Sequence, residues 1–349
     1  MHNVARKAVL SAITPAAQNT ASSKAIGGYF ELELPVSTFP LHHSAIRFQS
    51  ARAAFHALLS VGQPQRVWMP KYICDAMLAP LHALDVEIVF YDLDPGLGVD
   101  EDVVLEPQDW LLYVNYFGLC SDQEERLLRR FKPSQLIMDH SQAFFATPKD
   151  CLATIYSPRK FFGLPDGGLL HTTLKVSEPT EIDSGSVARC SHLLQRLDTS
   201  AEAGYADFKL AEETLRDTQP RRMSTLSTRL FSSIDLNRIK QRRNANFVYL
   251  HQRLKHLNGL DLDVVRIGGP LCYPLLMEYG NVQALREALA AERVFIPSYW
   301  PEVRTRVADD ALERQLVDGC LPIPCDQRYE RADLELVCDL LLRQMKRVF

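Results

Sequence analysis

The sequence predicts an α/β protein with a mostly parallel sheet in a large domain and a smaller α+β domain at its carboxyl end. Its 349 residues are about twice the usual length of one domain. Short β-prone runs alternate with helix-like stretches from residue 46 to residue 172, which is the rhythm of a sheet covered by helices. Beyond residue 183 this alternation stops, and longer helical patterns predict a different topology.

The first half of the chain supplies the expected strands of the large sheet. Each is a short run rich in aliphatic and aromatic residues, bounded by polar or turn-forming residues. In chain order these runs are RVWM (66–69), VEIVFY (86–91), WLLYVNY (110–116), QLIM (135–138), LATIY (152–156) and GLLHTT (168–173). In open α/β sheets the ligand binds beyond the carboxyl ends of the strands, so polar residues at those ends are candidate site residues.

Helices are predicted between and after these strands. FQSARAAFHALLSV (48–61) has Ser50 at its N-cap position, and CSDQEERLLRRF (120–131) has Ser121 or Asp122 there. QPRRMSTLS (219–227) has the composition of a loop leading into a helix. The last third contains three amphipathic helices and two strand-like runs: 236–257, 281–292 and 331–348, with LDLDVV (260–265) and LCYPLLM (271–277). We expect a large domain over 1–235 and a small domain over 236–349.

The composition directs attention to a small-molecule pocket. Hydrophobic residues make up 46% of the chain, charged residues 23%, and the net charge is -4, which favours neither a nucleic-acid nor a membrane partner. Eight cysteines without a CxxC motif argue against zinc and against a disulfide framework, and are typical of a reducing cytoplasm. The basic, acid-free segment 1–25 has a transit-like composition but is more simply a mobile arm, and no run is long enough to span a bilayer.

Candidate chemistry lies at the ends of two predicted strands. Asp139 follows QLIM, with Gln142 three residues later; Ser157 and Lys160 follow LATIY. A lysine near a buried aspartate is by itself explained as an ion pair. However, Gly167 and Gly168 follow Lys160 and allow a close backbone approach to a ligand or a subunit.

A phosphate seat is the third candidate feature. Ser50, Ala51 and Arg52 open a predicted helix, whose free N–H groups suit a phosphate, although an ordinary N-cap explains the same residues. A phosphate seat, an amine and a carboxylate are the parts that pyridoxal phosphate requires. The carboxylate keeps the cofactor's ring nitrogen protonated, so that the ring can accept electrons. The lysine binds the cofactor's aldehyde and then acts as a general base.

The ordered motifs SARAAF, IMDHSQAF and RKFFGLPDGG resemble the DegT/StrS-type sugar-nucleotide aminotransferases. The resemblance runs from IGGYFELELP at residue 26 to LPIPCDQRYERADLELV near the carboxyl terminus. It implies the fold-type I fold of pyridoxal-phosphate-dependent transferases, with a seven-stranded sheet. It also implies a cytoplasmic aminotransferase that transfers an amino group, from glutamate, to a keto group of a nucleotide-linked sugar or similar small ketone. The resemblance further implies a homodimer with shared active sites.

The same resemblance implies roles for individual residues. Asp139 corresponds to the partner of the pyridine nitrogen, Gln142 to the residue over the phenolic oxygen, and Lys160 to the Schiff-base lysine. The phosphate site is implied for Ser157 and for the backbone of Ala51 and Arg52, which replace the usual Gly-Thr. Ser157 lies three residues before Lys160, whereas the family's serine usually lies five before its lysine.

Other positions leave alternatives open. Tyr72 is the first candidate for the aromatic side chain that stacks on the cofactor, or else a core tyrosine. Pro220 replaces an asparagine that the family delivers to the partner's phosphate site, and Arg221 or Arg222 is a candidate substitute or a solvated charge. Candidate substrate contacts are Tyr29, His43 and Asn115, the last in VNYFG where many members have a histidine; His42 and Trp300 are further candidates with a structural alternative.

Two other functions remain open at this stage. One is a pyridoxal-phosphate-dependent lyase or dehydratase acting on a related sugar, since the same fold supports both reactions. Lys160 argues against the dehydrating members that carry histidine in its place. The other is a non-catalytic binding subunit, which the altered phosphate loop allows.

Overall fold

The computed structural model of the chain describes residues 27–36, 41–278 and 280–348. The described residues fall into two units, which divide after Leu34. The described part of the first unit has no helix or strand, and its Tyr29 and Phe30 side chains are almost fully exposed. Within the described ranges, no helix is both long enough and apolar enough to cross a bilayer.

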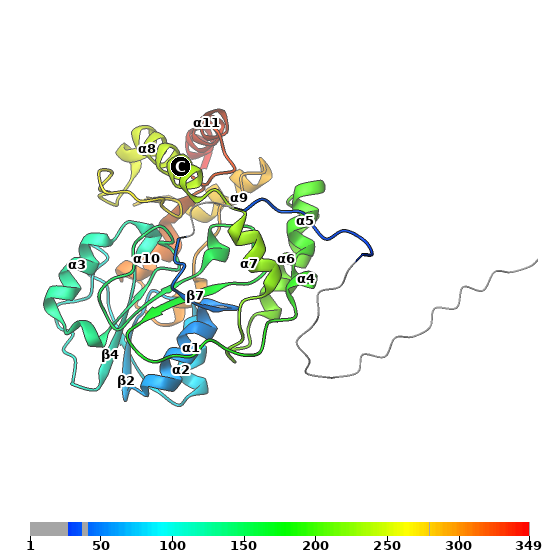
Figure 1. Cartoon of the computed structure of the whole chain (residues 1–349). Helices are drawn as coiled ribbons and strands as arrows, with labels where there is room; N and C mark the ends of the chain where they lie inside the picture. The colour runs from blue at the N-terminus through cyan, green and yellow to red at the C-terminus, as the bar shows by residue number, and fades with distance from the viewer. Residues whose placement is uncertain (1–26, 37–40, 279, 349) are drawn as a thin grey trace, which may run out of the picture. The chain divides into compact units, whose positions relative to one another are not determined.

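The second unit is built on a seven-stranded sheet, which confirms the predicted α/β fold class (Figure 1). Its strands all run parallel except β7, which is antiparallel to both of its neighbours. Six strands coincide with the predicted runs, whereas β1 has only three residues, too few for a periodic pattern. Across the sheet the order is β1 (Ile46–Phe48), β7 (Gly168–Thr172), β6 (Ala153–Tyr156), β5 (Leu136–Asp139), β4 (Asp109–Val114), β2 (Arg66–Pro70) and β3 (Glu87–Tyr91).

α-Helices lie in the connections β1–β2, β2–β3 and β4–β5 and in the segment after β7. Ser50 caps the first helix, its Oγ accepting a hydrogen bond from the Ala53 N–H at 3.1 Å, which confirms the predicted cap. The predicted cap of the second was wrong: Cys120 occupies the N-cap position, and it makes no side-chain cap bond. The helices are α1 (Ala51–Gly62), α2 (Ala79–Ala83), α3 (Ser121–Arg130), α4 (Ser186–Arg189), α5 (Ser191–Asp198), α6 (Tyr205–Thr214) and α7 (Thr225–Ser232).

The last part of the chain forms a two-stranded antiparallel sheet and four helices. These are α8 (Leu236–Leu254), β8 (Tyr273–Leu276), α9 (Val282–Ala291), α10 (Leu312–Gly319), β9 (Cys320–Ile323) and α11 (Arg331–Val348). In Figure 1, α8, α9 and α11 lie together, and α11 packs against the other two. A separate hydrophobic core lies among residues 247–341. The predicted domain boundary after residue 235 falls inside the second unit and stays a prediction.

The strand expected at 260–265 is absent, so that prediction was wrong. Asp263 Oδ1 accepts a hydrogen bond from the Val265 N–H at 2.7 Å, which is a local side-chain bond that stabilises a turn. The Val265 side chain is exposed, so the apparent alternation does not mark a half-buried strand. A side chain that satisfies its own backbone competes with sheet pairing.

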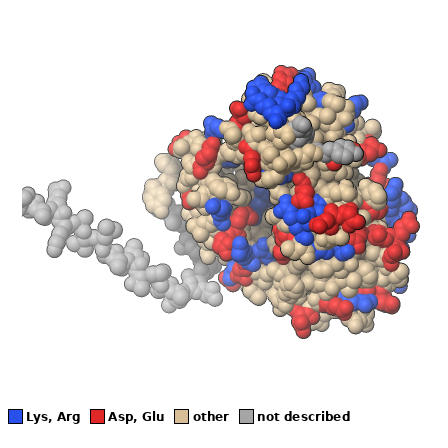
Figure 2. Space-filling model, turned by 180° about the vertical axis from the view of Figure 1, so that it is seen from behind, with Lys and Arg blue, Asp and Glu red and all other residues tan. Residues whose placement is uncertain are grey.

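Charges and thiols are distributed as in an ordinary globular surface and core. Acidic and basic side chains are interspersed over most of the face that Figure 2 shows. All eight cysteines are free, and six of them are buried; Cys74 and Cys190 are half-buried. No group of three or more potential ligand residues in the described ranges could hold a metal ion.

Gly168 is the tightest backbone contact of the sheet and gives the first testable prediction. A Cβ on this residue would lie 2.1 Å from the Ser50 carbonyl carbon, which is backbone and cannot move aside cheaply. We expect Gly168→Ala to lower the free energy of unfolding by roughly 3 kcal/mol in chemical denaturation. Gly163→Ala is the matched control, because its nearest neighbour is a Leu193 methyl group at 3.6 Å. Equal stability of the two variants would contradict the packing described.

Candidate active site at the carboxyl edge of the sheet

Polar residues follow three neighbouring parallel strands at one edge of the sheet. Asn115 follows β4, Asp139 ends β5, and Ser157 follows β6. Asp139 pairs with Val114 on one side and with Ile155 on the other, and its carbonyl oxygen accepts a hydrogen bond from the Asn115 N–H at 3.0 Å. The structure therefore brings these three buried side chains to the same edge.

One carboxylate oxygen of Asp139 accepts a hydrogen bond, and the other accepts none among the described residues. Its Oδ1 accepts a hydrogen bond from the Ser141 N–H at 2.8 Å, while Oδ2 has no hydrogen-bond partner among the described residues. The side chain is 3% exposed. Oδ2 is not among the fully buried atoms that lack a partner, so it remains accessible, as an atom that meets a ligand must be.

Gln142 stabilises the turn after β4. Its Oε1 accepts a hydrogen bond from the Phe117 N–H at 2.6 Å. Phe117 has a φ of 58°, in the left-handed region that a bulky side chain rarely adopts. The Gln142 side chain therefore holds a strained turn in place, and this contact was not foreseen from the sequence.

Lys160 lies on the connection between β6 and β7, at the end of a short 3₁₀ helix (Pro158–Lys160). Its N–H donates to the Ser157 carbonyl at 3.1 Å, and its side chain is exposed. It forms no ion pair within the described part of the chain, so the ion-pair explanation does not apply there. The Lys160 and Arg52 cations act on the Cys74 thiol, lowering a pKa that burial raises, which places both of these cations near Cys74.

The start of α1 lies at the same edge because β7 runs antiparallel to β6 and to β1. The Gly167 N–H donates to the Gln49 carbonyl at 2.7 Å, and Gly168 packs directly against Ser50 and Ala51. The first N–H groups of a helix, here those of Ala51 and Arg52, have no partner within the helix. Such a helix start can bind an anion.

The Arg52 side chain does not point to the helix start with the free backbone N–H groups; it binds elsewhere. Its Nε donates to the Ala76 carbonyl at 2.9 Å, and its Nη1 donates to the Leu215 carbonyl at 2.5 Å. Burial lowers the pKa of this guanidinium. Arg52 thus ties α1 to two distant loops, and only its backbone is free for a ligand at the helix start.

The aromatic side chains at the edge are arranged differently from the sequence-based expectation. Tyr72 follows β2 but is 1% exposed, with its ring 4.7 Å from the ring of Trp300. Burial raises the Tyr72 pKa well above its ordinary value. The Lys160 Nζ lies 6.0 Å from the centre of a Trp300 ring, so Trp300 is the aromatic side chain placed next to the lysine. Stacking by Tyr72 stays a prediction.

The segment that contains Arg221 and Arg222 runs beside the end of β1 in the same chain. The Gln49 and Arg221 backbones are joined by a bond from the Gln49 N–H to the Arg221 carbonyl at 3.0 Å, and Phe48 forms a bridge with Arg222. The Arg221 guanidinium binds Glu181 and Asp217. The Arg222 guanidinium is half-exposed, 3.9 Å from Glu178. A contact of either side chain with a partner's phosphate stays a prediction.

Three of the expected substrate contacts lie in different surroundings. Asn115 is buried at the edge; its Oδ1 accepts a hydrogen bond from the Cys120 N–H at 2.9 Å, and its Nδ2 has no partner within the described residues. His43 is exposed in a turn before β1. Tyr29 belongs to the first unit and is 98% exposed. Asn115 lies beside Asp139, whose carbonyl oxygen accepts the Asn115 N–H.

Two surface hollows lie away from this edge. One, of about 400 Å³, is lined by Ser44, Cys151 and His171 among others, at the opposite end of β6 and β7. The other, of about 520 Å³, lies beside α3 and is lined by Arg126 and Arg129 among others. Neither hollow is lined by a predicted site residue, so the carboxyl ends of the strands remain the candidate site.

Solved structures similar to this chain are aminotransferases. One is a DegT DnrJ EryC1 StrS aminotransferase from Brucella abortus, with 17% identity, a TM-score of 0.55, and coverage of 85% of this chain and 84% of that chain. DesI, in the presence of its TDP-sugar product, has 18% identity, a TM-score of 0.60, and coverage of 85% and 79%. NtdA from Bacillus subtilis, with bound cofactor PMP, has 16% identity, a TM-score of 0.62, and coverage of 86% and 73%.

The chain has the fold of these aminotransferases. No family model matches it, and no curated protein matches it. The aminotransferase fold confirms the fold-type I expectation of a mostly parallel, seven-stranded sheet. Sequence reasoning missed Asp166, whose buried carboxylate connects segments about 60 residues apart, because no local pattern marks such a contact.

His42 gives a testable prediction on pH dependence within this fold. Its ring packs 4.1 Å from the Tyr156 ring and its Nε2 donates to the Phe144 carbonyl at 2.9 Å, which is a core environment. Burial lowers its pKa from 6.5 to about 4, so between these values the unfolded chain binds a proton that the folded chain does not. We expect the folded state to lose up to about 3 kcal/mol from this group as pH falls from 6.5 to 4.

The measurement is the free energy of unfolding against pH for the wild type and for His42→Phe. The difference between the two curves should change over this interval, because carboxyl groups titrate in both proteins and cancel. Parallel curves would show that His42 does not couple to stability.

Proposed function

We propose that this protein is a pyridoxal-phosphate-dependent aminotransferase that moves an amino group, with glutamate as donor, onto a keto group of a nucleotide-linked sugar or similar small ketone. One observation carries the proposal. An exposed lysine, an incompletely bonded buried aspartate and an open helix start meet at one edge of an aminotransferase-fold sheet. Each of these has the chemistry that one part of the cofactor requires.

The residues present fit pyridoxal phosphate. The N–H groups of Ala51 and Arg52 and the hydroxyl of Ser157 would hold the phosphate, since the Ser157 hydroxyl has no side-chain partner among the described residues and Gly168 adds no Cβ there. The free Oδ2 of Asp139 would accept a hydrogen bond from the protonated ring nitrogen and so keep it protonated. When bound, the cofactor supplies an electron sink for the bond broken at the substrate Cα.

Lys160 would hold the cofactor covalently and then move a proton. Its amine lies at the exposed surface of the edge without an ion pair in the described ranges. When not bound to the cofactor, the Lys160 amine could take a proton from the Cα of the donor and return one to the carbon of the acceptor. The half-buried ring of Trp300 lies 6.0 Å from this amine.

Support for a sugar acceptor comes from one free polar group and from the similar structures. The Asn115 Nδ2 is a buried donor without a partner in the described part, at a position next to Asp139 where it could bind a substrate oxygen. DesI was solved with a TDP-sugar product. We also propose that His43 and Tyr29 contact the acceptor.

The test of the function uses the purified full chain with added pyridoxal phosphate. Borohydride reduction should fix the cofactor on Lys160, as peptide mapping by mass spectrometry will show, and Lys160→Ala should carry no label. A label on another lysine would exclude the assignment.

Asp139→Asn is the matched variant for the chemical step. It keeps the side-chain shape but removes the charge, so the label on Lys160 should persist while conversion of the bound cofactor by glutamate slows by about two to three orders of magnitude. Repeated release of a keto product without an acceptor, with the cofactor returning each time to its aldehyde form, would favour the lyase alternative. Binding of the cofactor without conversion by any amino donor would favour a non-catalytic subunit.

We also propose a homodimer with shared active sites. Exposed apolar side chains gather on and beside α4, α5 and α6, and an exposed patch of this kind supports a protein partner. They are Ile182, Val187, Leu194, Leu197, Tyr205, Phe208 and Leu210. A two-fold dimer would let a basic residue of one chain, Arg221 or Arg222, approach the phosphate of the other.

Mixing two inactive variants tests this sharing. Lys160→Ala and the double variant Arg221→Ala/Arg222→Ala carry their defects in different places, so a mixed dimer has one site with both defects and one with neither. Activity recovered on mixing is expected, and sedimentation should give a dimer. A monomer with full activity would contradict the proposal.

A further inference from the structure

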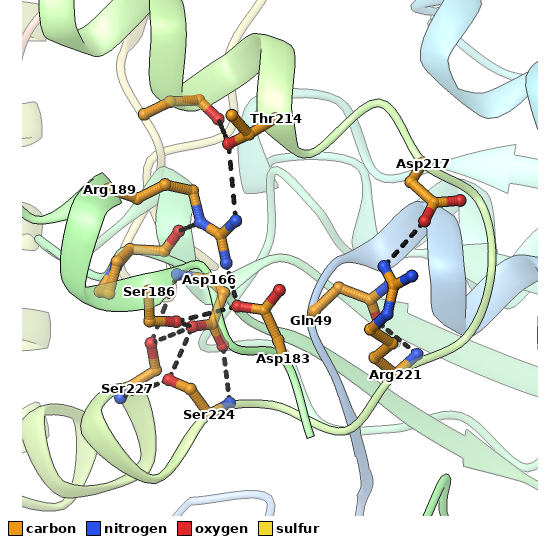
Figure 3. A network of polar contacts seen from close by, with 12 residues as sticks. Gln49, Asp166, Asp183, Ser186, Arg189, Thr214, Asp217, Arg221, Ser224 and Ser227 are labelled. Carbon is orange, nitrogen blue, oxygen red and sulfur yellow. Dashed lines mark hydrogen bonds and ion pairs between the residues drawn. The ribbon is translucent and has the colours of Figure 1, made fainter. Parts of the chain in front are cut away.

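Asp166 is a fully buried carboxylate on the connection that carries Lys160. Figure 3 shows it at the centre of three serine side chains that come from two segments, the start of α4 and the start of α7. Its Oδ2 accepts hydrogen bonds from Ser224 Oγ and Ser227 Oγ, both at 2.7 Å, and from Ser186 Oγ. Its Oδ1 accepts a bond from the Ser224 N–H at 3.0 Å. Four donors therefore converge on one side chain.

The charge of Asp166 is stabilised without a directly bonded cation in the described part of the chain. Arg189, the nearest candidate in Figure 3, forms its ion pair with Asp183 instead. Hydroxyl and N–H donors, together with the positive end of α7, offset the burial of the carboxylate. Ser224 also caps α7 by accepting the Ser227 N–H at 3.0 Å, so the carboxylate and the helix start depend on each other.

These bonds join the two segments that enclose the start of α1. On one side, Gly167 and Gly168, directly after Asp166, lie against Gln49 and Ser50. On the other side, residues 219–223, directly before Ser224, also bind Gln49: its Nε2 donates to the Gln219 carbonyl at 2.6 Å, and its Oε1 accepts the Arg221 N–H at 2.7 Å. The segment that leads into α1 is thus held between two segments.

The two segments that enclose the start of α1 also contact each other, at Gly167. A Cβ on Gly167 would lie 3.3 Å from the Met223 Cε, so the two enclosing segments also touch each other beside the carboxylate. Gly167 has a φ of 143°, which favours glycine and aims the chain from Asp166 toward Gln49. Loss of the Asp166 bonds would release both segments at once.

We propose that Asp166 is a positioning residue for the phosphate seat: by bonding Ser224 and Ser227 it fixes the two segments that hold Gln49–Ala51, and so sets where the α1 N–H groups point. The inference rests on the proposed function, because the ligand of this helix start is the phosphate of pyridoxal phosphate. The aldehyde of the cofactor would meet Lys160 and its ring nitrogen would meet Asp139, and Asp166 bonds neither of these residues. The effect on binding should therefore be specific to the phosphate.

The experiment compares pyridoxal 5'-phosphate with pyridoxal, which lacks the phosphate. Dissociation constants of both are measured by absorbance with the cofactor-free full chain. Asp166→Asn keeps the shape but loses the charge and one acceptor, and it should raise the Kd of pyridoxal 5'-phosphate at least tenfold while changing that of pyridoxal less than twofold. A merely structural role would weaken both ligands alike, and that result would overturn the proposal.

Two serine variants give a matched comparison that does not depend on the folding of Asp166→Asn. Ser227→Ala and Ser186→Ala each remove one hydroxyl that bonds the same Asp166 oxygen. Only Ser227 belongs to the segment that continues from residues 219–223. Ser227→Ala should reduce the preference for the phosphorylated ligand about threefold or more, and Ser186→Ala less than twofold. Equal ratios in both variants and the wild type would refute the assignment.

Failure of the proposed function gives a different result. If wild-type protein binds neither pyridoxal 5'-phosphate nor pyridoxal, or is not labelled at Lys160, the cofactor assignment falls, and the positioning role falls with it. If wild-type protein binds and is labelled but the Asp166→Asn and Ser227→Ala ratios match it, only the positioning role falls.

Discussion

The reversed direction of β7 is the constraint on which the rest of the candidate site depends. An antiparallel neighbour can be reached by a short connection, whereas a parallel one needs a long crossover. The chain therefore turns back between Tyr156 and Gly168 at the carboxyl edge and leaves Lys160 there. The same reversal makes β1 end beside Gly168, so α1 starts at this edge too. A parallel β7 would separate the lysine from the helix start.

Two buried carboxylates near the end of β5, Glu124 and Asp139, differ in their charged partners. His140 and Lys149 both contact the buried Glu124 carboxylate, and such a group is tolerated only when its members are paired. The adjacent Asp139 has only one backbone donor on its carboxylate within the described residues. The Glu124 carboxylate thus has two cationic neighbours, although its Oε2 makes no hydrogen bond, whereas Asp139 has no ion pair among the described residues. That contrast is expected where a site sacrifices local stability for ligand binding.

Features that depend on residues close together in the sequence could be predicted, whereas those that depend on distant residues could not. Ser50 was recognised as a cap because its partner, Ala53, lies in the next turn. Asp139 and Lys160 were recognised because strand periodicity located the ends of β5 and β6. The strand over 260–265 was wrong because an Asp263 side-chain bond outweighed an alternating pattern. The order of strands, the tether of Arg52 and the position of Trp300 next to Lys160 depend on contacts between distant segments.

By itself, the sequence determined the α/β class, six strands of the large sheet and the identity of the ionisable groups at their ends, because these follow from local periodicity and residue chemistry. Tertiary structure alone decided which oxygens and amides remain unbonded there. It left Asp139 Oδ2 and Asn115 Nδ2 without partners in the described chain, and it enclosed Asp166 among three serines. The physical reason is that hydrogen-bond satisfaction is a property of the packed neighbourhood, which residues far apart in the sequence create together.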